Sequence, residues 1–385
     1  MKPSDLSPDA PGRLVPVDGT GWAFVPHPLP PVLAIDWELA GLAADATGSL
    51  GELAGLMRAM PNPHLLYAPF VRREAVLSSR IEGTRASLQD LVVHEAGGAQ
   101  AGRSGDAPEV ANYVRALEHA LARRASLPVS LRLLREMHAL LFEGLEAARL
   151  APGEFRRSQN WIGRPGSSLL DATFVPPPPD ALDGLLSDFE TFLHQDGPLP
   201  PVVRLALIHY QFEAIHPFLD GNGRIGRLLI LLLLVEWQLL PGPALVLSAY
   251  FERTRREYYA HLLSVSREGT WHAWLRYFLG GIVAESRDAN RRSRALIELR
   301  EDYRARVVQD TRSPGSALRI LDGLFEVPAL SIPATATALG LTQRTVQLQV
   351  ARLEALAILR ETTGRLRDRI FIAPGIIDIV DRGSA

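Results

Sequence analysis

The residues best suited to chemistry lie in one stretch, positions 216–227, which reads His-Pro-Phe-Leu-Asp-Gly-Asn-Gly-Arg-Ile-Gly-Arg. Two glycines in it, Gly221 and Gly223, permit positive φ, so the backbone N–H groups around Asn222 can turn toward one point. Such a loop binds anions, and a helix N-terminus directly after it adds partial positive charge. The stretch therefore predicts a binding loop for phosphate.

Four side chains of the stretch suit work on a bound nucleotide. Arg224 and Arg227, three residues apart, supply two guanidinium groups that match a polyphosphate. Asp220 supplies a hard carboxylate oxygen, and a carboxylate placed among phosphates usually holds Mg²⁺. His216 is the available general base, because histidine titrates near neutral pH.

Two apolar segments must position these residues. Positions 205–215 carry apolar residues at roughly helical spacing, and Pro217 biases His216 away from helical geometry, so a helix is expected to end at the histidine. Positions 228–235 are apolar on all sides, which predicts a helix surrounded by other helices. The motif is thus expected to form a polar loop between two buried helices.

Three other interpretations of the stretch compete with this one. Residues 221–226 match the dinucleotide pattern G-x-G-x-x-G, but that pattern needs a preceding strand and an acid about 20 residues later, and positions 240–244 contain none. A calcium loop starting at Asp220 fails because Arg224 and Ile225 occupy the positions of a ligand and of the turn glycine. A structural polar turn remains open, although it does not require a histidine and two arginines.

Composition limits the chemistry further. The chain of 385 residues has a net charge of −2, which argues against a nucleic-acid surface over the whole chain. It contains no cysteine, which excludes disulfides and a thiol nucleophile and fits a reducing cytoplasm. Lys2 is its one lysine, so phosphate chemistry must depend on arginine, backbone amides and metal. No signal peptide or membrane span is expected, and the protein is placed in the cytoplasm.

At positions 216–227 the chain resembles the Fic family, whose signature is His-x-Phe-x-Asp/Glu-Gly-Asn-Gly-Arg-x-x-Arg, with every fixed position present. The resemblance implies transfer of AMP from ATP to a Ser, Thr or Tyr hydroxyl of target proteins, and of the enzyme itself, with release of pyrophosphate. It implies that His216 deprotonates the hydroxyl and that Asp220 holds Mg²⁺. The phosphates are then bound by Asn222 with the Gly221 and Gly223 amides, and by Arg224 and Arg227.

A second element resembles the family's inhibitory motif, Ser/Thr-x-x-x-Glu-Gly/Asn. It is formed by Ser78, Glu82 and Gly83 at the end of an expected helix that starts near His64. Ser78 and Glu82 are one turn apart and share a face. The resemblance implies that Glu82 pairs with Arg227 and blocks productive seating of the γ phosphate. The alternative is an exposed glutamate before a C-cap glycine.

Two further sets of residues follow from the resemblance. Short β runs around a turn at 166–167 suggest a hairpin, and Trp161, Ile162 and Gly163 resemble the family's flap, which pairs with the target backbone as an added strand. A plain connecting hairpin is the alternative. Tyr258 and Tyr259 correspond to residues that line the adenine and ribose pocket, although paired aromatics are also common in cores.

The C-terminal region is expected to form a winged helix. Helices at 316–325, 332–339 and 342–356, with Gly340 at the turn, have helix-turn-helix spacing, and two β runs at 358–362 and 369–372 read as the wing. Such modules bind proteins about as often as DNA; Gln343, Arg344 and Gln347 are expected to face the groove if DNA is bound.

The sequence thus predicts a mainly α protein, a helical Fic bundle with a hairpin flap and a C-terminal winged helix. Its expected parts are an N-terminal region with the inhibitory helix (1–108), a catalytic core (109–285), a connecting helix (286–312) and the winged helix (313–385). ATP and a protein hydroxyl are the expected substrates, with Mg²⁺ as cofactor. Removal of AMP, another nucleotide-diphosphate donor, a DNA-binding regulator with a nucleotide-sensing core, and a homodimer all stay open.

Overall fold

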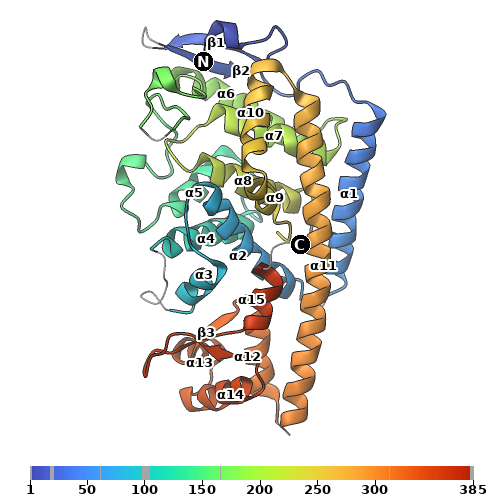
Figure 1. Ribbon diagram of the computed structural model, residues 1–385, viewed down its shortest axis with the longest axis vertical. Coiled ribbons are helices and arrows are strands. Elements are labelled where there is room, and N and C mark those ends of the chain that lie inside the picture. Colours follow the sequence, from blue (N-terminus) through green and yellow to red (C-terminus); the bar gives the residue numbers. More distant parts are fainter. Residues whose placement is uncertain are drawn as a thin grey trace. The chain divides into compact units, whose positions relative to one another are not determined.

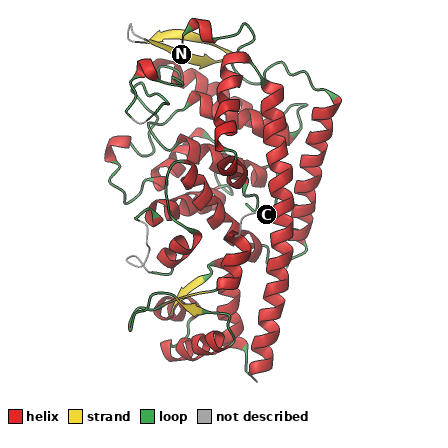
Figure 2. Cartoon of the chain, in the orientation of Figure 1, coloured by secondary structure: helices red, strands yellow, loops and turns green. Residues whose placement is uncertain are grey.

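The computed structural model describes residues 2–17, 21–60, 62–97, 105–164, 166–311 and 313–381. Helices dominate these residues and the strands are few and short (Figure 2), which confirms the expected mainly α class. The chain divides into two compact units. The first comprises Met1–Leu50, Arg115–Leu239 and Tyr250–Ala284; the second comprises Gly51–Val114, Leu240–Ala249 and Glu285–Ala385.

The elements follow one another as labelled in Figure 1. The first unit holds β1 (Gly12–Val17), β2 (Gly21–Pro26), α5 (Leu131–Leu141), α6 (Leu182–His194), α7 (Pro201–Ile215), α8 (Asn222–Glu236) and α10 (Arg255–Glu268). The second holds α2 (His64–Ile81), α3 (Leu88–Glu95), α12 (Gly315–Glu326), β3 (Ala329–Ser331), α13 (Ile332–Leu339), α14 (Gln343–Ala355), β4 (Arg360–Glu361), β5 (Ile370–Ile372) and α15 (Pro374–Asp381).

Four helices run from one unit into the other: α1 (Trp37–Arg58), α4 (Ala107–Arg123), α9 (Leu247–Arg253) and α11 (Trp271–Asp310). Short 3₁₀ turns occupy Pro3–Asp5, Ala148–Leu150, Leu169–Asp171 and Pro179–Ala181. In the described parts of the chain, no helix is both long enough and apolar enough to cross a bilayer.

The helix pair α7 and α8 forms the core of the first unit. Residues 228–235 of α8 are at most 4% exposed, which explains why this helix is apolar on every side. The two helices approach closely at Gly226, where an added Cβ atom would lie 2.6 Å from Glu213 Oε1 and 3.1 Å from Phe212 Cδ1. A side chain larger than that of glycine would therefore force the Glu213 carboxylate and the Phe212 ring to move.

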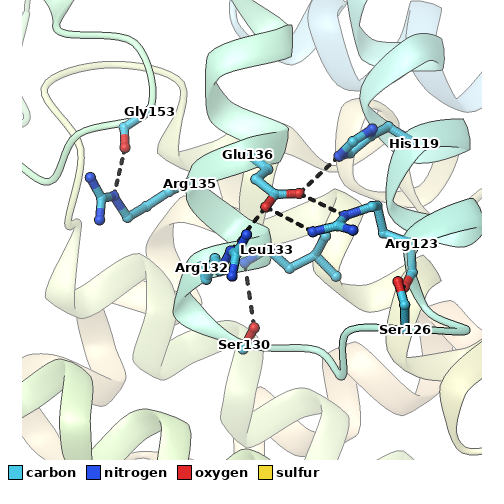
Figure 3. A network of polar contacts seen from close by, with 9 residues as sticks. All are labelled: His119, Arg123, Ser126, Ser130, Arg132, Leu133, Arg135, Glu136 and Gly153. Carbon is cyan, nitrogen blue, oxygen red and sulfur yellow. Dashed lines mark hydrogen bonds and ion pairs between the residues drawn. The ribbon is translucent and has the colours of Figure 1, made fainter.

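A polar network ties α4 to α5 within the same unit (Figure 3). The Glu136 carboxylate accepts hydrogen bonds from Arg123 Nε at 3.1 Å and Arg132 Nε at 3.2 Å, and it lies 3.0 Å from His119 Nε2. Hydrogen bonds from Arg123 and His119 are the main causes that lower the pKa of Glu136 to about 2. Glu136 therefore stays ionised and anchors the helices that flank the motif.

The second unit is held by buried polar contacts around α2. Glu74 is 1% exposed and accepts hydrogen bonds from Ser248 N at 3.0 Å, from the Ser248 hydroxyl, and from the Tyr113 hydroxyl at 3.4 Å. The neighbouring Arg73 donates to Asp288 Oδ2 at 3.2 Å. The side chains of Glu74, Arg73 and Asp288 are all buried, so each would be costly to leave without its partners. These contacts therefore fix the register of α2 against its neighbours.

Several elements differ from the sequence prediction in their extent. The Pro- and Gly-rich residues 1–31 predict an extended arm, which is wrong, because β1 and β2 pair as an antiparallel hairpin with Gly12 opposite Pro26. The sequence predicts separate helices at 271–282 and 287–308, whereas these residues lie in one 40-residue helix, α11, with no proline between them to end it. The segment around Tyr250 divides at Thr254 into α9 and α10, and α3 is not predicted.

The C-terminal elements follow the expected order closely. The α12–β3–α13–α14–β4–β5 sequence, with a three-stranded sheet in the order β3-β5-β4, is the arrangement that we interpret as a winged helix. Gly340 ends α13 with φ +63°, and the Gly340 and Leu341 amides donate back to that helix. The tight turn between α13 and α14 therefore depends on a glycine.

Candidate active site

The loop that carries the motif begins with a histidine in a left-handed conformation. Helix α7 ends at Ile215, as the sequence predicts, and His216 follows with φ +50° and ψ +60°. Its amide still donates to Phe212 O at 3.0 Å, while its ring Nδ1 lies 3.3 Å from Glu213 O. Because a carbonyl can only accept, the proton is assigned to Nδ1, and Nε2 of the neutral ring carries the lone pair.

A buried arginine outside the motif fixes this histidine. The Arg156 guanidinium, 3% exposed, donates to His216 O at 2.9 Å, to Ile215 O at 3.4 Å and to Pro177 O at 2.6 Å. Its own amide donates to Pro217 O at 2.9 Å. Burial lowers the pKa of Arg156 to about 10, so the group remains charged at neutral pH. The end of α7 is therefore held by charge-assisted hydrogen bonds.

A buried histidine outside the motif fixes the other side of the loop. His138 on α5 accepts from Gly153 N at Nδ1 (2.8 Å), so its Nε2 carries the proton and donates to Asp220 O at 3.0 Å. Its ring stacks on Phe218 with centroids 3.9 Å apart and planes 5° apart. Burial, opposed by the Asp220 carbonyl, lowers the pKa of His138 to about 4, and the nearby Arg224 contributes.

Asn222 closes the loop from within. Its side chain, 1% exposed, accepts from Phe218 N at 2.8 Å and donates to Phe218 O at 2.8 Å. Asn160 also donates to Phe218 O, at 3.0 Å. Since both ends of the Asn222 amide bond the loop backbone, this side chain shapes the loop.

The charged residues of the motif differ in exposure. Arg224 is 3% exposed, with its guanidinium carbon 5.1 Å from the centre of the Phe142 ring, and Arg227 is 2% exposed. The Asp220 side chain is 56% exposed; its Oδ1 accepts from Gly221 N at 2.6 Å and lies 3.9 Å from Arg224 Nη2. Gly221 has φ +78°, and an added Cβ there would meet Phe142 at 3.0 Å. The loop thus carries an exposed carboxylate, Asp220, and is followed by two buried guanidinium groups, Arg224 and Arg227.

The inhibitory-motif residues lie at the end of α2, in the second unit. Helix α2 ends at Ile81; Glu82 is its C-cap and is exposed, whereas Ser78 is fully buried. Gly83 has φ +112°, a conformation that favours glycine, and its amide donates to Arg80 O. The expected helix stop at Gly83 is confirmed.

The expected flap hairpin is reduced to a single bridge. Ile162 pairs with Phe174 in antiparallel fashion: Ile162 N donates to Phe174 O at 2.8 Å and Phe174 N donates to Ile162 O at 3.1 Å. Trp161 and Ile162 are 44% and 37% exposed, and an added Cβ at Gly163 would meet Ser167 Oγ. Two short β runs are predicted here, but the structure has one bridge in a loop with exposed apolar side chains.

The two tyrosines of the expected adenine pocket have different environments. Tyr258 is 1% exposed; its hydroxyl lies 2.8 Å from His209 Nε2 and its ring stacks on Phe251 with centroids 4.5 Å apart. Burial and the neighbouring Arg227 lower the pKa of His209 to about 3. Tyr258 is therefore a core residue with no surface for a nucleotide, and Tyr259, 40% exposed, is the one suited to contact a base.

Sequence reasoning missed His138 and Arg156. A histidine among the apolar residues of α5 (Leu134, Met137 and Leu141) is a signal for a buried polar group, because it shares their helical face. Arg156 carries no such signal, since it lies in an irregular segment whose partners are carbonyls from two other parts of the chain.

The fold and the loop define a helical protein with a polar turn between two buried helices. Residues 128–234 match the family described as Fic/DOC family, and residues 40–122 match the Fic/DOC family N-terminal region. These two segments of the chain, 40–122 and 128–234, therefore belong to the Fic/DOC family.

Relatives and solved structures agree with this assignment. The chain is 33% identical over 153 residues to the protein adenylyltransferase Fic of Drosophila grimshawi, a match that covers 39% of this chain and 28% of that protein. A second relative of that name, from Drosophila yakuba, is 35% identical over 127 residues, which cover 32% of this chain and 22% of that protein. The chain therefore matches less than a third of the length of these relatives.

Two solved structures show the same fold. A Fic family protein from Desulfovibrio desulfuricans superposes with a TM-score of 0.56 at 20% identity, covering 90% of this chain and 98% of that one. Fic-1 from C. elegans superposes with a TM-score of 0.50 at 23% identity, covering 68% and 74%.

Proposed function

We propose that the protein transfers AMP from ATP to a Ser, Thr or Tyr hydroxyl of target proteins and of itself, with release of pyrophosphate. The observation that carries this proposal is the loop between α7 and α8, which combines an exposed carboxylate, the N-terminus of α8 and two buried arginines beside a histidine. The names of the Drosophila relatives support the same reaction.

In this proposal His216 accepts the proton of the target hydroxyl. The hydroxyl oxygen attacks the α phosphorus of ATP in line with the leaving pyrophosphate, and the bond from that phosphorus to the bridging oxygen breaks. His216 is suited to the role because its Nδ1 points to Glu213 O, which orients Nε2 as the acceptor. Positioning and charge neutralisation then supply most of the rate increase.

The residues present fit a magnesium ion carried by the nucleotide. Mg²⁺ prefers one or two carboxylates together with phosphate oxygens and water, and Asp220 offers one carboxylate that is more than half exposed. Among the described residues no group of three metal-ligating side chains is present, so the phosphates must complete the coordination. When bound, the ion neutralises charge on the phosphates, while Arg224 and Arg227 hold the β and γ groups.

We also propose that Glu82 inhibits the enzyme by pairing with Arg227, and that Trp161, Ile162 and Gly163 receive the target backbone. The spacing of Ser78, Glu82 and Gly83, with Glu82 as the C-cap of α2, supports the first assignment. The exposed side chains of Trp161 and Ile162, beside the bridge to Phe174, support the second, because a strand added here would pack against them.

Labelled ATP tests both assignments. With ³²P at the α position, His216→Ala should abolish label transfer to protein, and Glu82→Gly should raise it, including onto the protein itself. Glu146→Gly, which also removes an exposed glutamate from a turn, is the matched control and should leave labelling unchanged. Equal labelling by the wild type and by Glu82→Gly would reject the inhibitory role; label transfer by His216→Ala would reject the base.

Two related reactions use the same groups. The protein could remove AMP from a modified hydroxyl, or transfer a different phosphate-linked group from another nucleotide diphosphate. Mass spectrometry of a modified target separates these cases, because adenylyl and phosphoryl adducts differ in mass.

A further inference from the structure

The wing of the C-terminal module carries a basic loop that the proposed reaction does not use. Between β4 and β5 the segment 364–369 reads Gly-Arg-Leu-Arg-Asp-Arg, with three arginines and one acid. Arg365 and Arg367 are exposed, and Leu366 at the tip is fully exposed. Figure 2 shows a loop leaving this small sheet away from the helices.

This loop is built on a fixed base. The Glu361 carboxylate accepts hydrogen bonds from Thr363 N at 2.8 Å and Gly364 N at 3.1 Å, so the acid at the start of the wing is directed into the turn. Arg369 lies 5.2 Å over the ring of Phe371, which is buried in the sheet. The base of the loop is therefore fixed, with Arg365 and Arg367 exposed and the Glu361 carboxylate bonded within the turn.

The helix beside the wing carries polar groups on its outer face. Thr342 caps α14 by accepting from Thr345 N at 3.1 Å, and Val346, Val350 and Leu353 face the module's core. The first turns expose Gln343, Arg344 and Gln347. Amide and guanidinium side chains at the start of such a helix match the hydrogen-bonding edges of adenine and guanine in the major groove.

We propose that this module binds duplex DNA, with α14 in the major groove and the 364–369 loop over the neighbouring minor groove. Arg365 and Arg367 contact phosphates or the floor of the narrow groove, where negative potential is highest. Leu366 between them is placed as an apolar wedge at a base step, a role that exposed leucines take in minor-groove binders.

The chemistry of this surface favours DNA over a protein partner. A protein-binding patch is contiguous and apolar, whereas here the exposed wing leucine is isolated between guanidinium groups. The exposed Leu348 lies separately on α14, where an apolar side chain can contact a thymine methyl group. The excess of arginine on helix and wing is complementary to a phosphate backbone.

The base of the wing is anchored to another element of the same unit. Gln89 on α3 donates to the Thr362 hydroxyl at 3.2 Å, one residue beyond β4. A wing held in this way keeps its distance from α14, which is what simultaneous contact with two adjacent grooves requires.

The test measures DNA binding by the full-length protein. Fluorescence anisotropy with a labelled mixed-sequence duplex of about 30 base pairs, from about 50 to about 200 mM salt, gives the affinity and its salt dependence. Arg365→Ala/Arg367→Ala should lower the slope of log K against log salt by about 2 and weaken binding roughly 10- to 100-fold at 0.1 M salt. Arg287→Ala/Arg294→Ala, exposed on α11, is the matched charge control and should bind like the wild type.

Two further measurements keep the outcomes distinct. Leu366→Ala should weaken binding to duplexes with flexible pyrimidine–purine steps while the salt slope stays constant, because no charge is removed. Absence of binding, or equal loss in the wing and control variants, overturns the proposal. Sedimentation that shows a self-association abolished by the wing variants, without DNA binding, assigns the surface to a second copy instead.

Discussion

Replacing His138 by phenylalanine should change how the stability of the first unit depends on pH. The pKa of His138 is lowered to about 4, chiefly by burial, whereas a histidine in the unfolded chain titrates near 6.5. Between these values the unfolded state binds one more proton than the folded state, so stability falls as the pH drops from about 6.5 to about 4. Above pH 6.5 the ring is neutral in both states and makes no such contribution.

The size of the effect follows from the two values. From pH 7 to pH 5, the lowered pKa removes about 2 kcal/mol of stability from the wild type, and this loss is absent from the phenylalanine variant. At pH 7 the variant is itself less stable, by about 2–3 kcal/mol, because Asp220 O and Gly153 N each lose a partner. The stacking on Phe218 is preserved by a second aromatic ring. The two proteins should therefore be close in stability at pH 5.

Urea unfolding followed by tryptophan fluorescence at pH 7, 6 and 5 measures this convergence. The buried His209, whose pKa is lowered to about 3, is present in both proteins, so its contribution cancels in the difference. His194→Phe, at an exposed position of α6, is the matched control. A difference between wild type and His138→Phe that stays constant over the three pH values would show that His138 is not held neutral, and the tautomer assigned to it would be wrong.

Three other substitutions probe the scaffold. Gly226→Ala should destabilise the protein by about 1–3 kcal/mol in urea unfolding, because its Cβ would meet Glu213, whereas Gly184→Ala, with open space in α6, should stabilise it by up to about 1 kcal/mol. Glu136→Gln should cost about 1 kcal/mol at pH 7, and this difference should vanish as the pH falls from 4.5 through about 2, where the wild-type carboxylate is protonated. Arg156→Lys should displace the loop that holds His216 by about 1 Å, because the hydrogen bond to His216 O is lost. This displacement should lower kcat for labelled AMP transfer at least tenfold, with little change in the KM for ATP.

The sequence predicts the parts of this molecule whose cause is local. The helix stop at His216 follows from Pro217, and the stop after Ile81 follows from Gly83. The elements of the C-terminal module are recovered within a few residues because turn glycines and apolar periodicity mark them. The motif itself is visible because its chemistry is concentrated in twelve consecutive positions.

The parts that the sequence does not predict depend on contacts between distant residues. Tyr258 and Tyr259 are identical in type, and the aromatic cluster with His209 and Phe251 decides that the first is buried. The continuous helix α11 is a similar case. Gly280 and Gly281 would permit the helix to end, but it continues through both. Gly281 packs closely against Tyr250, since an added Cβ would lie 2.8 Å from that ring. Local propensity leaves these outcomes open and tertiary packing selects one.

The left-handed His216 shows why the motif depends on residues outside it. A non-glycine residue with φ +50° costs about 1–3 kcal/mol, and it persists only where the surroundings enforce it. Arg156 supplies that enforcement by bonding the carbonyls of residues 215 and 216, while His138 and Asn222 fix the loop on its other side. Without these contacts the histidine can relax toward ordinary backbone conformations, and its ring then leaves the position that the proposed reaction requires. The conformation of His216 therefore depends on two buried side chains outside the twelve-residue motif, His138 and Arg156, as well as on the motif itself.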